Sequence, residues 1–459
     1  MDFVHRPYVP EETIAAIATP PGEGAIAILR VSGKEALEVA SRLFHAPIAS
    51  YPSHTVRLKK IYTLNGTLLD EVLLLPMRKP KSFTGEDTVE IHCHGGSLVA
   101  KKILEELLQA GARAATPGEF TLKAFMNGKV DLTQAEAIQQ IICSKNEIAY
   151  CSAEQHLQGA LSKKIQSFQK RLLDLAAVLE AFVDFPEEGL EFMTQEEMIS
   201  SLSSILESMQ TLSDSFHEGR MAQEGLRLCL AGPPNAGKSS LMNALLGKER
   251  AIVTEIAGTT RDLLEDHLLL GELHFRLIDT AGIRQTEEVI EKEGIRRSKK
   301  AMDEADLILL VLDASKPLSE EAKLLIKTTP SSKTLLIWNK IDLCAPSFTP
   351  LDLLQDQVCI SAQTMQGLED LKQALYRKIW KKGPPSQEEV LLTTLRHKQA
   401  LDKAIEALRT VRQGLVEEMS PEFLCLDMRK ALFELGTILG MNLSEEILSS
   451  IFSKFCIGK

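Results

Sequence analysis

Residues 232–239 read Gly-Pro-Pro-Asn-Ala-Gly-Lys-Ser, a spacing of glycines, lysine and serine that can hold phosphate groups. The segment matches G-x-x-x-x-G-K-[ST] at every fixed position, between an apolar run at 226–231 that predicts a strand and a helical pattern at 239–246. Backbone N–H groups and the helix N-terminus of such a loop face the phosphates. Lys238 should reach the β- and γ-phosphates, and the Ser239 hydroxyl should bind Mg²⁺. The segment therefore predicts a nucleoside triphosphate site.

Three later motifs occur in the order that a guanine-nucleotide site requires: Asp279-Thr280-Ala281-Gly282, Asn339-Lys340-Ile341-Asp342 and Ser361-Ala362. Asp279 ends a predicted strand, where a carboxylate can accept hydrogen bonds from Mg²⁺-bound water, and the Gly282 N–H would face the γ-phosphate. Asp342 can accept two N–H groups of guanine, which adenine lacks. An isolated Asn-Lys-x-Asp is more often a surface loop, but here it follows an apolar strand. The motifs predict a site for GTP.

The predicted switch loop leaves the hydrolytic group open. Residues 254–262 form a polar loop in which Thr260 is the best candidate to complete Mg²⁺ coordination. Ile283 stands where many signalling GTPases carry a glutamine that orients water, and isoleucine cannot do so. Hydrolysis is then either very slow or assisted by another group, for which four acidic residues follow: Glu287, Glu288, Glu291 and Glu293.

Bulk properties limit the protein class. The 459 residues predict two to four domains, with 44% hydrophobic and 25% charged residues as in globular proteins. The net charge of −11 argues against binding nucleic acid by overall charge but allows a local patch for a structured RNA. Eight scattered cysteines without a CxxC pair predict reduced thiols. With no signal-like start and no apolar run of about 20 residues, we expect a soluble, cytoplasmic protein.

The pattern of predicted strands and helices changes three times along the chain. Residues 13–118 carry short strand patterns and one helix at 98–110, residues 122–221 are helical, and helical texture returns from 388. Between them, 226–382 alternate strands and helices as in a mostly parallel, doubly wound sheet. We predict a multidomain α/β protein: an N-terminal α+β domain (1–120), a discontinuous helical domain (121–221 plus 384–459) and an inserted Ras-like P-loop G domain (222–383).

Further motifs make the chain resemble the tRNA-modification GTPases called MnmE or TrmE over its whole length. The G domain shares with that family Asn235, residues 258–262 (Gly-Thr-Thr-Arg-Asp) and Ile283 in place of glutamine. The flanking regions share the segments at 19–22, 28–33, 82–87, 94–96, 117–120, 129–132, 134–137 and the terminal Cys-Ile-Gly-Lys at 456–459.

The resemblance implies a GTPase activated by K⁺ and by pairing of two G domains. Asn235 is the implied K⁺ side-chain ligand, with backbone carbonyls of Thr254, Ile256 and Thr259. Glu291, aligned by its distance from residues 294–295, is the implied catalytic acid that orients water. The full set of predicted GTP contacts is Asn235, Ala236, Gly237, Lys238, Ser239, Ser240, Thr254, Glu255, Ile256, Ala257, Gly258, Thr259, Thr260, Asp279, Thr280, Ala281, Gly282, Asn339, Lys340, Asp342, Ser361 and Ala362.

For the N-terminal domain the resemblance implies a constitutive dimer that binds the reduced folate 5-formyltetrahydrofolate. The implied folate contacts are Arg30, Glu90, Lys129 and the C-terminal Lys459, and Cys456 is a candidate participant in the modification chemistry. The residues alone would be interpreted otherwise: Arg30 and Lys129 as solvated charges, and Cys456 as an inert surface thiol. The sequence His92-Cys93-His94 does not predict a metal site, because neighbouring residues on a strand face opposite ways.

The resemblance thus implies a homodimeric, K⁺-dependent GTP hydrolase that works with an FAD/NADH-dependent partner enzyme of the MnmG/GidA type in a heterotetramer. The pair would add an aminomethyl or 5-carboxymethylaminomethyl group to C5 of uridine 34, the wobble position, of certain tRNAs, with GTP hydrolysis gating the reaction. The alternative is a ribosome-assembly GTPase without covalent RNA chemistry, which would need no folate domain; folate binding by residues 1–120 separates the two. A dynamin-like membrane GTPase lacks an amphipathic or apolar segment to support it.

Overall fold

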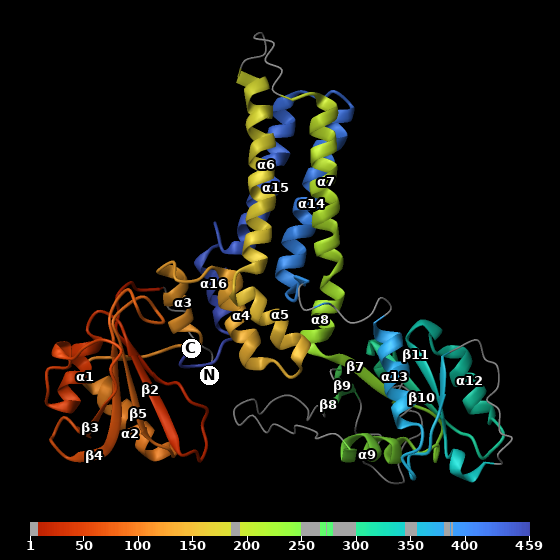
Figure 1. The fold of residues 1–459 in the computed structure, drawn as a ribbon, viewed down its shortest axis with the longest axis horizontal. Helices are drawn as coiled ribbons and strands as arrows, with labels where there is room; N and C mark the ends of the chain where they lie inside the picture. The colour runs from red at the N-terminus through yellow and green to blue at the C-terminus, as the bar shows by residue number, and fades with distance from the viewer. Residues whose placement is uncertain are drawn as a thin grey trace. The chain divides into compact units, whose positions relative to one another are not determined.

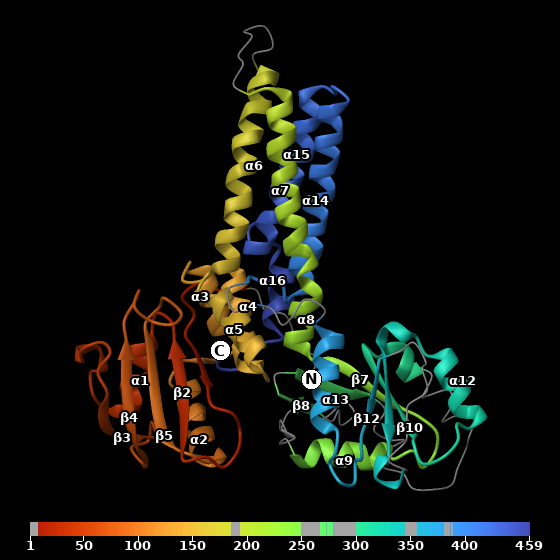
Figure 2. The ribbon, with the colours of Figure 1, turned by 45° about the vertical axis from the view of Figure 1, so that its right-hand side comes forward.

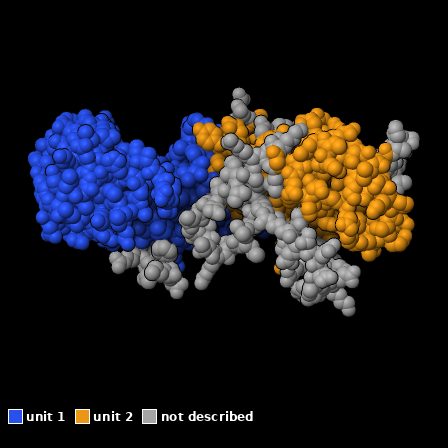
Figure 3. Space-filling model, turned by 90° about the horizontal axis from the view of Figure 1, so that it is seen from below, with its two compact units in different colours: residues 1–143, 153–213, 396–459 blue, residues 144–152, 214–395 orange. Residues whose placement is uncertain are grey.

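The computed structural model describes residues 8–184, 193–248, 267–271, 273–278, 300–344, 356–380, 386 and 389–459. The chain divides into two compact units, coloured separately in Figure 3. Unit 1 comprises residues 1–143, 153–213 and 396–459, and unit 2 comprises residues 144–152 and 214–395. None of the helices in the described ranges is long and apolar enough to cross a membrane.

Unit 1 begins with a six-stranded sheet in the order β3-β4-β5-β2-β1-β6. Only β1 and β6 pair in parallel, and the other neighbours are antiparallel. The strands are β1 (Ile14–Ile17), β2 (Ile26–Ser32), β3 (Arg57–Tyr62), β4 (Leu68–Met77), β5 (Thr88–His94) and β6 (Arg113–Ala114). The helices of this part are α1 (Ala36–Phe44), the short η1 (Ile48–Ser50) and α2 (Ser97–Gln109).

One face of this sheet is covered by α1 and α2, and the other is open at β3 and β4 but covered at β1, where Ile14 and Ala16 are buried against Phe120. Along β4, Val72 and Leu74 are buried in the core formed with α1 and α2, whereas Leu73 between them is exposed, as the period of a strand requires. Leu58 of β3 lies opposite Leu73 and is also exposed. Helix α1 is an addition to the pattern expected from the sequence, which placed a single helix in this region.

The rest of unit 1 is helical. Helices α6 (Ala160–Asp184), α7 (Gln195–Asp214), α14 (Leu395–Val416) and α15 (Pro421–Leu439) run side by side as a bundle in both views (Figure 1, Figure 2). Helix α6 buries residues spaced three or four apart, such as Leu161, Ile165 and Phe168, because this spacing places them on one face. Two helical stretches separated by the inserted domain therefore form one bundle. The smaller helices of unit 1 are α3 (Glu119–Met126), α4 (Leu132–Cys143) and α16 (Glu445–Phe452). Helix α5 (Glu147–Leu157) belongs in part to each unit, and α8 (Phe216–Glu224) belongs to unit 2.

A buried ion cluster joins the first turn of α14 to α4. The Arg396 guanidinium donates to Glu136 Oε1 and Oε2 at 3.0 Å each, and His397 Nε2 lies 2.6 Å from Glu136 Oε2. Arg396 also donates to the carbonyls of Thr437 (2.7 Å) and Ile438 (3.1 Å) at the end of α15. Both carbonyls belong to the last turn of α15, where that of Thr437 also accepts from the Gly440 N–H at 3.2 Å, so Arg396 caps α15 as well as neutralising Glu136.

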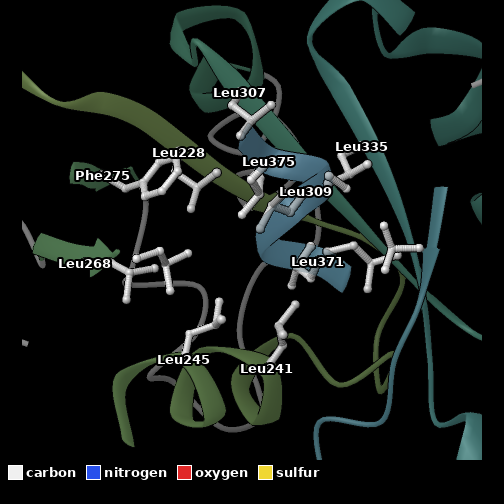
Figure 4. Packing of buried hydrophobic residues seen from close by; sticks show 14 of the residues in the cluster. Leu228, Leu241, Leu245, Leu268, Phe275, Leu307, Leu309, Leu335, Leu371 and Leu375 are labelled. Carbon is white, nitrogen blue, oxygen red and sulfur yellow. The ribbon is translucent and has the colours of Figure 1, made fainter. Parts of the chain in front are cut away.

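Unit 2 contains a second six-stranded sheet, in the order β12-β11-β10-β7-β9-β8, parallel except for β8. Its apolar strands are buried on both faces, as is usual for parallel sheets. Leucines and Phe275 from the sheet, α9 and α13 fill the space between these elements (Figure 4). The strands are β7 (Leu226–Ala231), β8 (His267–Leu270), β9 (Leu273–Ile278), β10 (Leu307–Asp313), β11 (Thr334–Asn339) and β12 (Gln357–Cys359). The helices are α9 (Lys238–Lys248), α12 (Glu320–Thr328), α13 (Leu368–Ile379), and the short η2 (Ser331–Lys333) and η3 (Ile341–Leu343).

Candidate functional site

The predicted nucleotide motifs follow the carboxyl ends of parallel strands in unit 2. Residues 232–237 follow β7, Asn339 ends β11, and Ser361 comes two residues after β12. Because β7, β10, β11 and β12 are parallel neighbours, these segments emerge at the same edge of the sheet. This edge is where doubly wound sheets bind ligands.

The loop at 232–237 needs its glycines for space and conformation. Gly232 has φ +144, and an added Cβ would lie 2.2 Å from the carbonyl oxygen of Val311. Gly237 has φ +94, and its Cβ would lie 2.2 Å from Asn339 Nδ2. Asn235, also left-handed at φ 61, is exposed on the loop. The backbone can therefore pass close to β10 and β11 only with glycine at 232 and 237, which fits a phosphate-binding loop.

Lys238 is the first residue of α9, and its side chain binds back to the start of the phosphate loop. Its ammonium group donates to the carbonyls of Gly232 (2.7 Å) and Pro233 (2.9 Å). Burial lowers the pKa of Lys238, although the charge of Glu321 opposes the shift. Ser239 and Ser240 follow on the first turn of α9 and are exposed. The helix start therefore presents a cation and hydroxyl groups together, as phosphate and Mg²⁺ binding requires.

Asn339 connects the three described motifs. Its side-chain nitrogen donates to the Ala236 carbonyl at 3.0 Å, and its side-chain oxygen accepts from the Ala362 N–H at 3.0 Å. Only 2% of Asn339 is exposed. The asparagine of the predicted base motif is thus a buried brace that fixes the phosphate loop relative to the segment Ser361-Ala362.

Lys340 forms a second brace with a residue that the sequence did not predict. Its ammonium group donates to the Asn235 carbonyl at 2.6 Å and to Asp313 Oδ2 at 2.7 Å. Burial tends to raise the pKa of Asp313, but hydrogen bonds from Lys340 and Ser315 outweigh it and hold that pKa below its usual value. Asp313 ends the apolar strand β10, and this strand-end position is a signal that could have identified it. Asp342 lies beyond, on η3, and is exposed.

The other predicted residues of the nucleotide site lie outside the described ranges. They are Thr254, Glu255, Ile256, Ala257, Gly258, Thr259, Thr260, Asp279, Thr280, Ala281, Gly282 and Glu291. The predictions that Thr260 binds Mg²⁺, that three carbonyls of this loop bind K⁺ and that Glu291 orients water therefore stay predictions.

In unit 1, three of the predicted folate contacts are near one another through a cluster centred on Arg30. Arg30 donates to Glu90 Oε1 from Nε (3.0 Å) and Nη2 (2.8 Å), and from Nη1 to the Gly458 carbonyl (3.3 Å), next to Lys459. Its guanidinium lies over the rings of Phe83 (5.0 Å) and Phe120 (5.7 Å). Arg30 is therefore held by a carboxylate, a carbonyl and two aromatic faces. The residue type alone would instead predict a solvated charge.

Lys129 joins the same region from another side. It is exposed, and its ammonium group donates to the Pro80 carbonyl at 3.0 Å. The chain terminus is anchored by the Gly118 N–H, which donates to the Cys456 carbonyl at 3.3 Å, while Cys456 itself is exposed. Gly458 has φ +91 and packs closely on Ala18, so a Cβ added to Gly458 would lie 2.7 Å from the Cα of Ala18.

His92 was not predicted in this cluster, yet its Nε2 lies 3.3 Å from Glu90 Oε2. Cys93 points to the opposite, covered face, where it is 2% exposed and burial raises the pKa of its thiol to about 11. The strand therefore separates Cys93 from its histidine neighbours, in agreement with the period of two. The alternation Glu90, His92 on one face was the signal available in the sequence.

Comparisons with known proteins cover the whole chain. The model of the MnmE helical domain matches residues 132–456, and that of the GTP-binding protein TrmE N-terminus matches residues 13–129. The tRNA modification GTPase MnmE of Protochlamydia amoebophila is 59% identical over 459 residues, 100% of both chains. That of Chlamydia pneumoniae is 48% identical over 449 residues, 98% of this chain and 99% of its own. The FeoB G domain from Methanococcus jannaschii is 26% identical and covers 34% of this chain and 98% of its own, with a TM-score of 0.25.

Proposed function

The chain belongs to the MnmE family of tRNA modification GTPases, and from that premise we propose that it is a K⁺-dependent, homodimeric GTPase that modifies C5 of the wobble uridine of certain tRNAs. It binds GTP and is a GTP hydrolase of tRNA modification. Its proposed partner is an FAD/NADH-dependent enzyme of the MnmG type, with 5-formyltetrahydrofolate as one-carbon source and an aminomethyl or 5-carboxymethylaminomethyl product. GTP hydrolysis would gate this chemistry. The proposed domains are 1–120, 121–221 with 384–459, and 222–383.

The observation that carries the proposal is the pair of braces at the phosphate loop. Asn339 and Lys340 hold the loop by the Ala236 and Asn235 carbonyls, so the base motif and the phosphate motif are built as one site. When bound there, Mg²⁺ on Ser239 and Thr260 would supply positive charge next to the phosphates. A preorganised loop lowers the reorganisation needed for transition-state stabilisation.

Replacing Asn235 by alanine should abolish a preference for potassium. The Asn235 side chain is exposed, and its backbone is fixed by Lys340, so its amide oxygen is available to a cation without loss of the loop. We expect GTP turnover of the wild type to be at least about tenfold faster in KCl than in NaCl at equal ionic strength, as expected when a cation replaces an arginine finger. Asn243→Ala, an exposed asparagine of α9, is the matched control and should keep the preference. Equal wild-type rates in both salts would remove the K⁺ assignment.

Glu291→Ala tests hydrolysis and tRNA modification together. Loss of the group that orients water should lower GTP turnover on the order of 100-fold while GTP affinity stays within about twofold. Mass spectrometry of wobble nucleosides should show unmodified uridine in cells lacking the gene, restored by the wild-type gene and not by Glu291→Ala. Normal wobble modification in the deletion strain would contradict the proposed function. A parallel loss of GTP affinity would make Glu291 structural instead.

The open face of the N-terminal sheet supports the proposed dimer. Leu58 and Leu73 face each other across β3 and β4 and are both exposed, and Ile26 of β2 is exposed on the same face beyond the histidines of β5. Burial of these apolar side chains against a second copy is favourable by about 25 cal/mol per Å². The mass of the full chain in solution, with and without Leu73→Glu, tests this.

The Arg30 cluster supports the folate site over the ribosome-assembly alternative. The Arg30 guanidinium is largely buried, pairs with Glu90 and lies over the rings of Phe83 and Phe120. This arrangement offers a planar ligand both charge and aromatic surface. Arg30, Glu90, Lys129 and Lys459 remain the proposed contacts. A GTPase switch without folate chemistry has no need of such a site. Absence of reduced-folate binding by the full chain would favour the alternative.

A further inference from the structure

Cations gather at one edge of the N-terminal sheet. Residues 45–62 and 76–85 contain six lysines and arginines and no aspartate or glutamate, in a chain whose net charge is −11. The structure places these two segments next to each other, at the edge strand β3 and its neighbour β4 (Figure 1). Four of these cations, together with Lys129, which contacts the second segment at the Pro80 carbonyl, form what we call the basic edge. Its members are Arg57, Lys59, Lys79, Lys81 and Lys129.

Hydrogen bonds hold the two segments together. The His54 N–H donates to the Pro76 carbonyl at 2.8 Å, and the Arg78 N–H donates to Ser53 Oγ at 3.0 Å. The Arg78 guanidinium turns back and donates to the Tyr51 carbonyl at 3.3 Å. Arg78 therefore fixes the segment that follows β4 to the segment that precedes β3. Lys79 and Lys81, on either side of Pro80, are exposed.

Tyr51 positions the strand cations on the covered side of the sheet. The Arg57 guanidinium lies 4.4 Å and the Lys59 ammonium 5.7 Å from the centre of its ring. In the β3–β4 register, Arg57 and Lys59 lie opposite the buried Leu74 and Val72, so they belong to the face away from the open one. A dimer through the open face would therefore leave these cations available.

Several other cations of this domain have a carboxylate partner, whereas the basic edge has none among the described residues. Arg42 pairs with Glu38 at 2.9 Å and Lys123 with Glu86 at 2.8 Å, and Arg113 pairs with Glu119. In contrast, no carboxylate among the described residues forms an ion pair with any member of the basic edge. The Asp87 carboxylate lies nearby, but it accepts the Lys79 backbone N–H at 2.9 Å and forms no ion pair with the Lys79 ammonium group. Ammonium and guanidinium groups without an ion-pair partner attract a polyanion.

The basic edge ends at the Arg30 cluster. The loop between β4 and β5 carries Lys79 and Lys81, then Phe83, whose ring lies 5.0 Å from the Arg30 guanidinium. Lys129 is bound to the same loop through the Pro80 carbonyl. A polyanion that follows the basic edge would thus be brought to the proposed folate site.

We propose that the basic edge binds the sugar–phosphate backbone of tRNA and directs it towards the Arg30 cluster. This inference rests on the proposed function, because only a tRNA substrate needs to reach the one-carbon donor. Lysine and arginine neutralise phosphates without reading sequence, and an arginine held against an aromatic ring can also stack on an exposed base. A local patch of this kind lets an acidic chain bind RNA.

The test is the double substitution Lys79→Ala with Lys81→Ala in the full chain, measured by binding of unmodified bulk tRNA over a range of KCl concentrations. We expect about a tenfold loss of affinity at low salt, and a salt slope lower by about two, one for each phosphate contact. Lys79→Arg with Lys81→Arg should restore binding. Lys101→Ala with Lys102→Ala, two exposed lysines of α2, is the matched control with the same charge change and should bind as the wild type. All variants should keep the wild-type GTP turnover, which reports correct folding.

The outcomes separate this inference from the proposed function. Wild-type binding that persists unchanged in the Lys79/Lys81 alanine variant would overturn the basic edge as the RNA site while leaving the function intact. Equal losses in the α2 control would mean that only net charge matters, which also overturns it. A wild-type chain that does not bind tRNA, alone or with its partner enzyme, would contradict the function as well. Binding to vesicles of anionic lipid that depends on Lys79 and Lys81, with tRNA binding unaffected, would assign the patch to a membrane surface.

Discussion

Replacing Asp342 by asparagine should exchange the base preference of the enzyme from guanine to xanthine. The Asp342 carboxylate is proposed to accept two N–H groups of guanine, and an amide in its place presents a donor to a donor. Xanthine has a carbonyl in place of the exocyclic amine, so it can accept from that amide. Sites built on such hydrogen bonds discriminate by about 10⁴-fold, and we expect the ratio of kcat/KM for GTP over XTP to change by that order.

The structure makes this substitution a clean one. Asp342 is exposed on η3, and the braces of Asn339 and Lys340 to the phosphate loop do not involve its side chain. Asp356→Asn is the matched control, since that aspartate is 64% exposed and pairs with Lys378 in the same unit. The control should keep its preference for GTP. An Asp342→Asn enzyme that still prefers GTP would show that another residue selects the base.

The sequence predicted the strands of the G domain closely because they are continuous apolar runs. Residues 226–231 were expected as a strand and form β7, and the run at 307–312 forms β10 with one residue more. Helix α1 was missed because Ser32, Gly33 and Lys34 before it resemble a turn, although its buried residues are apolar in the sequence and pack against the sheet. Tertiary burial decides such short helices more than propensity does.

The motifs of the candidate site could be predicted from the sequence, whereas the contacts that Asn339 and Lys340 make with the phosphate loop could not. Lys238 and Asn339 are fixed by pattern, but the pattern does not show that Asn339 is buried between two backbone segments. The sequence marks Asp313 only as the end of an apolar strand, and its role as a partner of Lys340 depends on the register that places β10 next to β11. Arg30 shows the same limit: its partners Glu90 and Gly458 are separated from it by 60 and 428 residues.

Substituting Glu136 should produce the largest loss of stability in unit 1. Glu136 is enclosed by Arg396 and His397, and removal of one partner from a buried ion pair leaves the other charge uncompensated. We expect Glu136→Gln to lower the free energy of unfolding by about 3–5 kcal/mol. Glu180→Gln is the matched control: Glu180 also joins two helices through an arginine, Arg429, but that pair is 47% and 70% exposed. Its loss should cost less than about 1 kcal/mol.

The dependence on pH identifies the cause. Burial alone would raise the pKa of Glu136, but the charge and hydrogen bond of His397 and then those of Arg396 outweigh it and lower the pKa from 4.5 to about 2. A carboxyl whose folded pKa is depressed stabilises the fold fully above its unfolded pKa and loses that contribution as the pH falls through the folded value. The stability difference between wild type and Glu136→Gln should therefore be constant above about pH 5 and shrink between pH 4.5 and 2. Chemical denaturation followed by helix content measures this difference at each pH.

The position of Glu136 gives this stability a structural consequence. Arg396 is the second residue of α14 and holds both α4 and the end of α15. Beyond α15 the chain continues through α16 to Gly458, whose carbonyl accepts from Arg30. Loss of Glu136 should thus increase amide hydrogen exchange in the first turn of α14 and the last turn of α15 before the rest of the bundle, because these two turns share Arg396. Uniform exchange along the bundle in Glu136→Gln would show that the cluster does not hold this junction in particular.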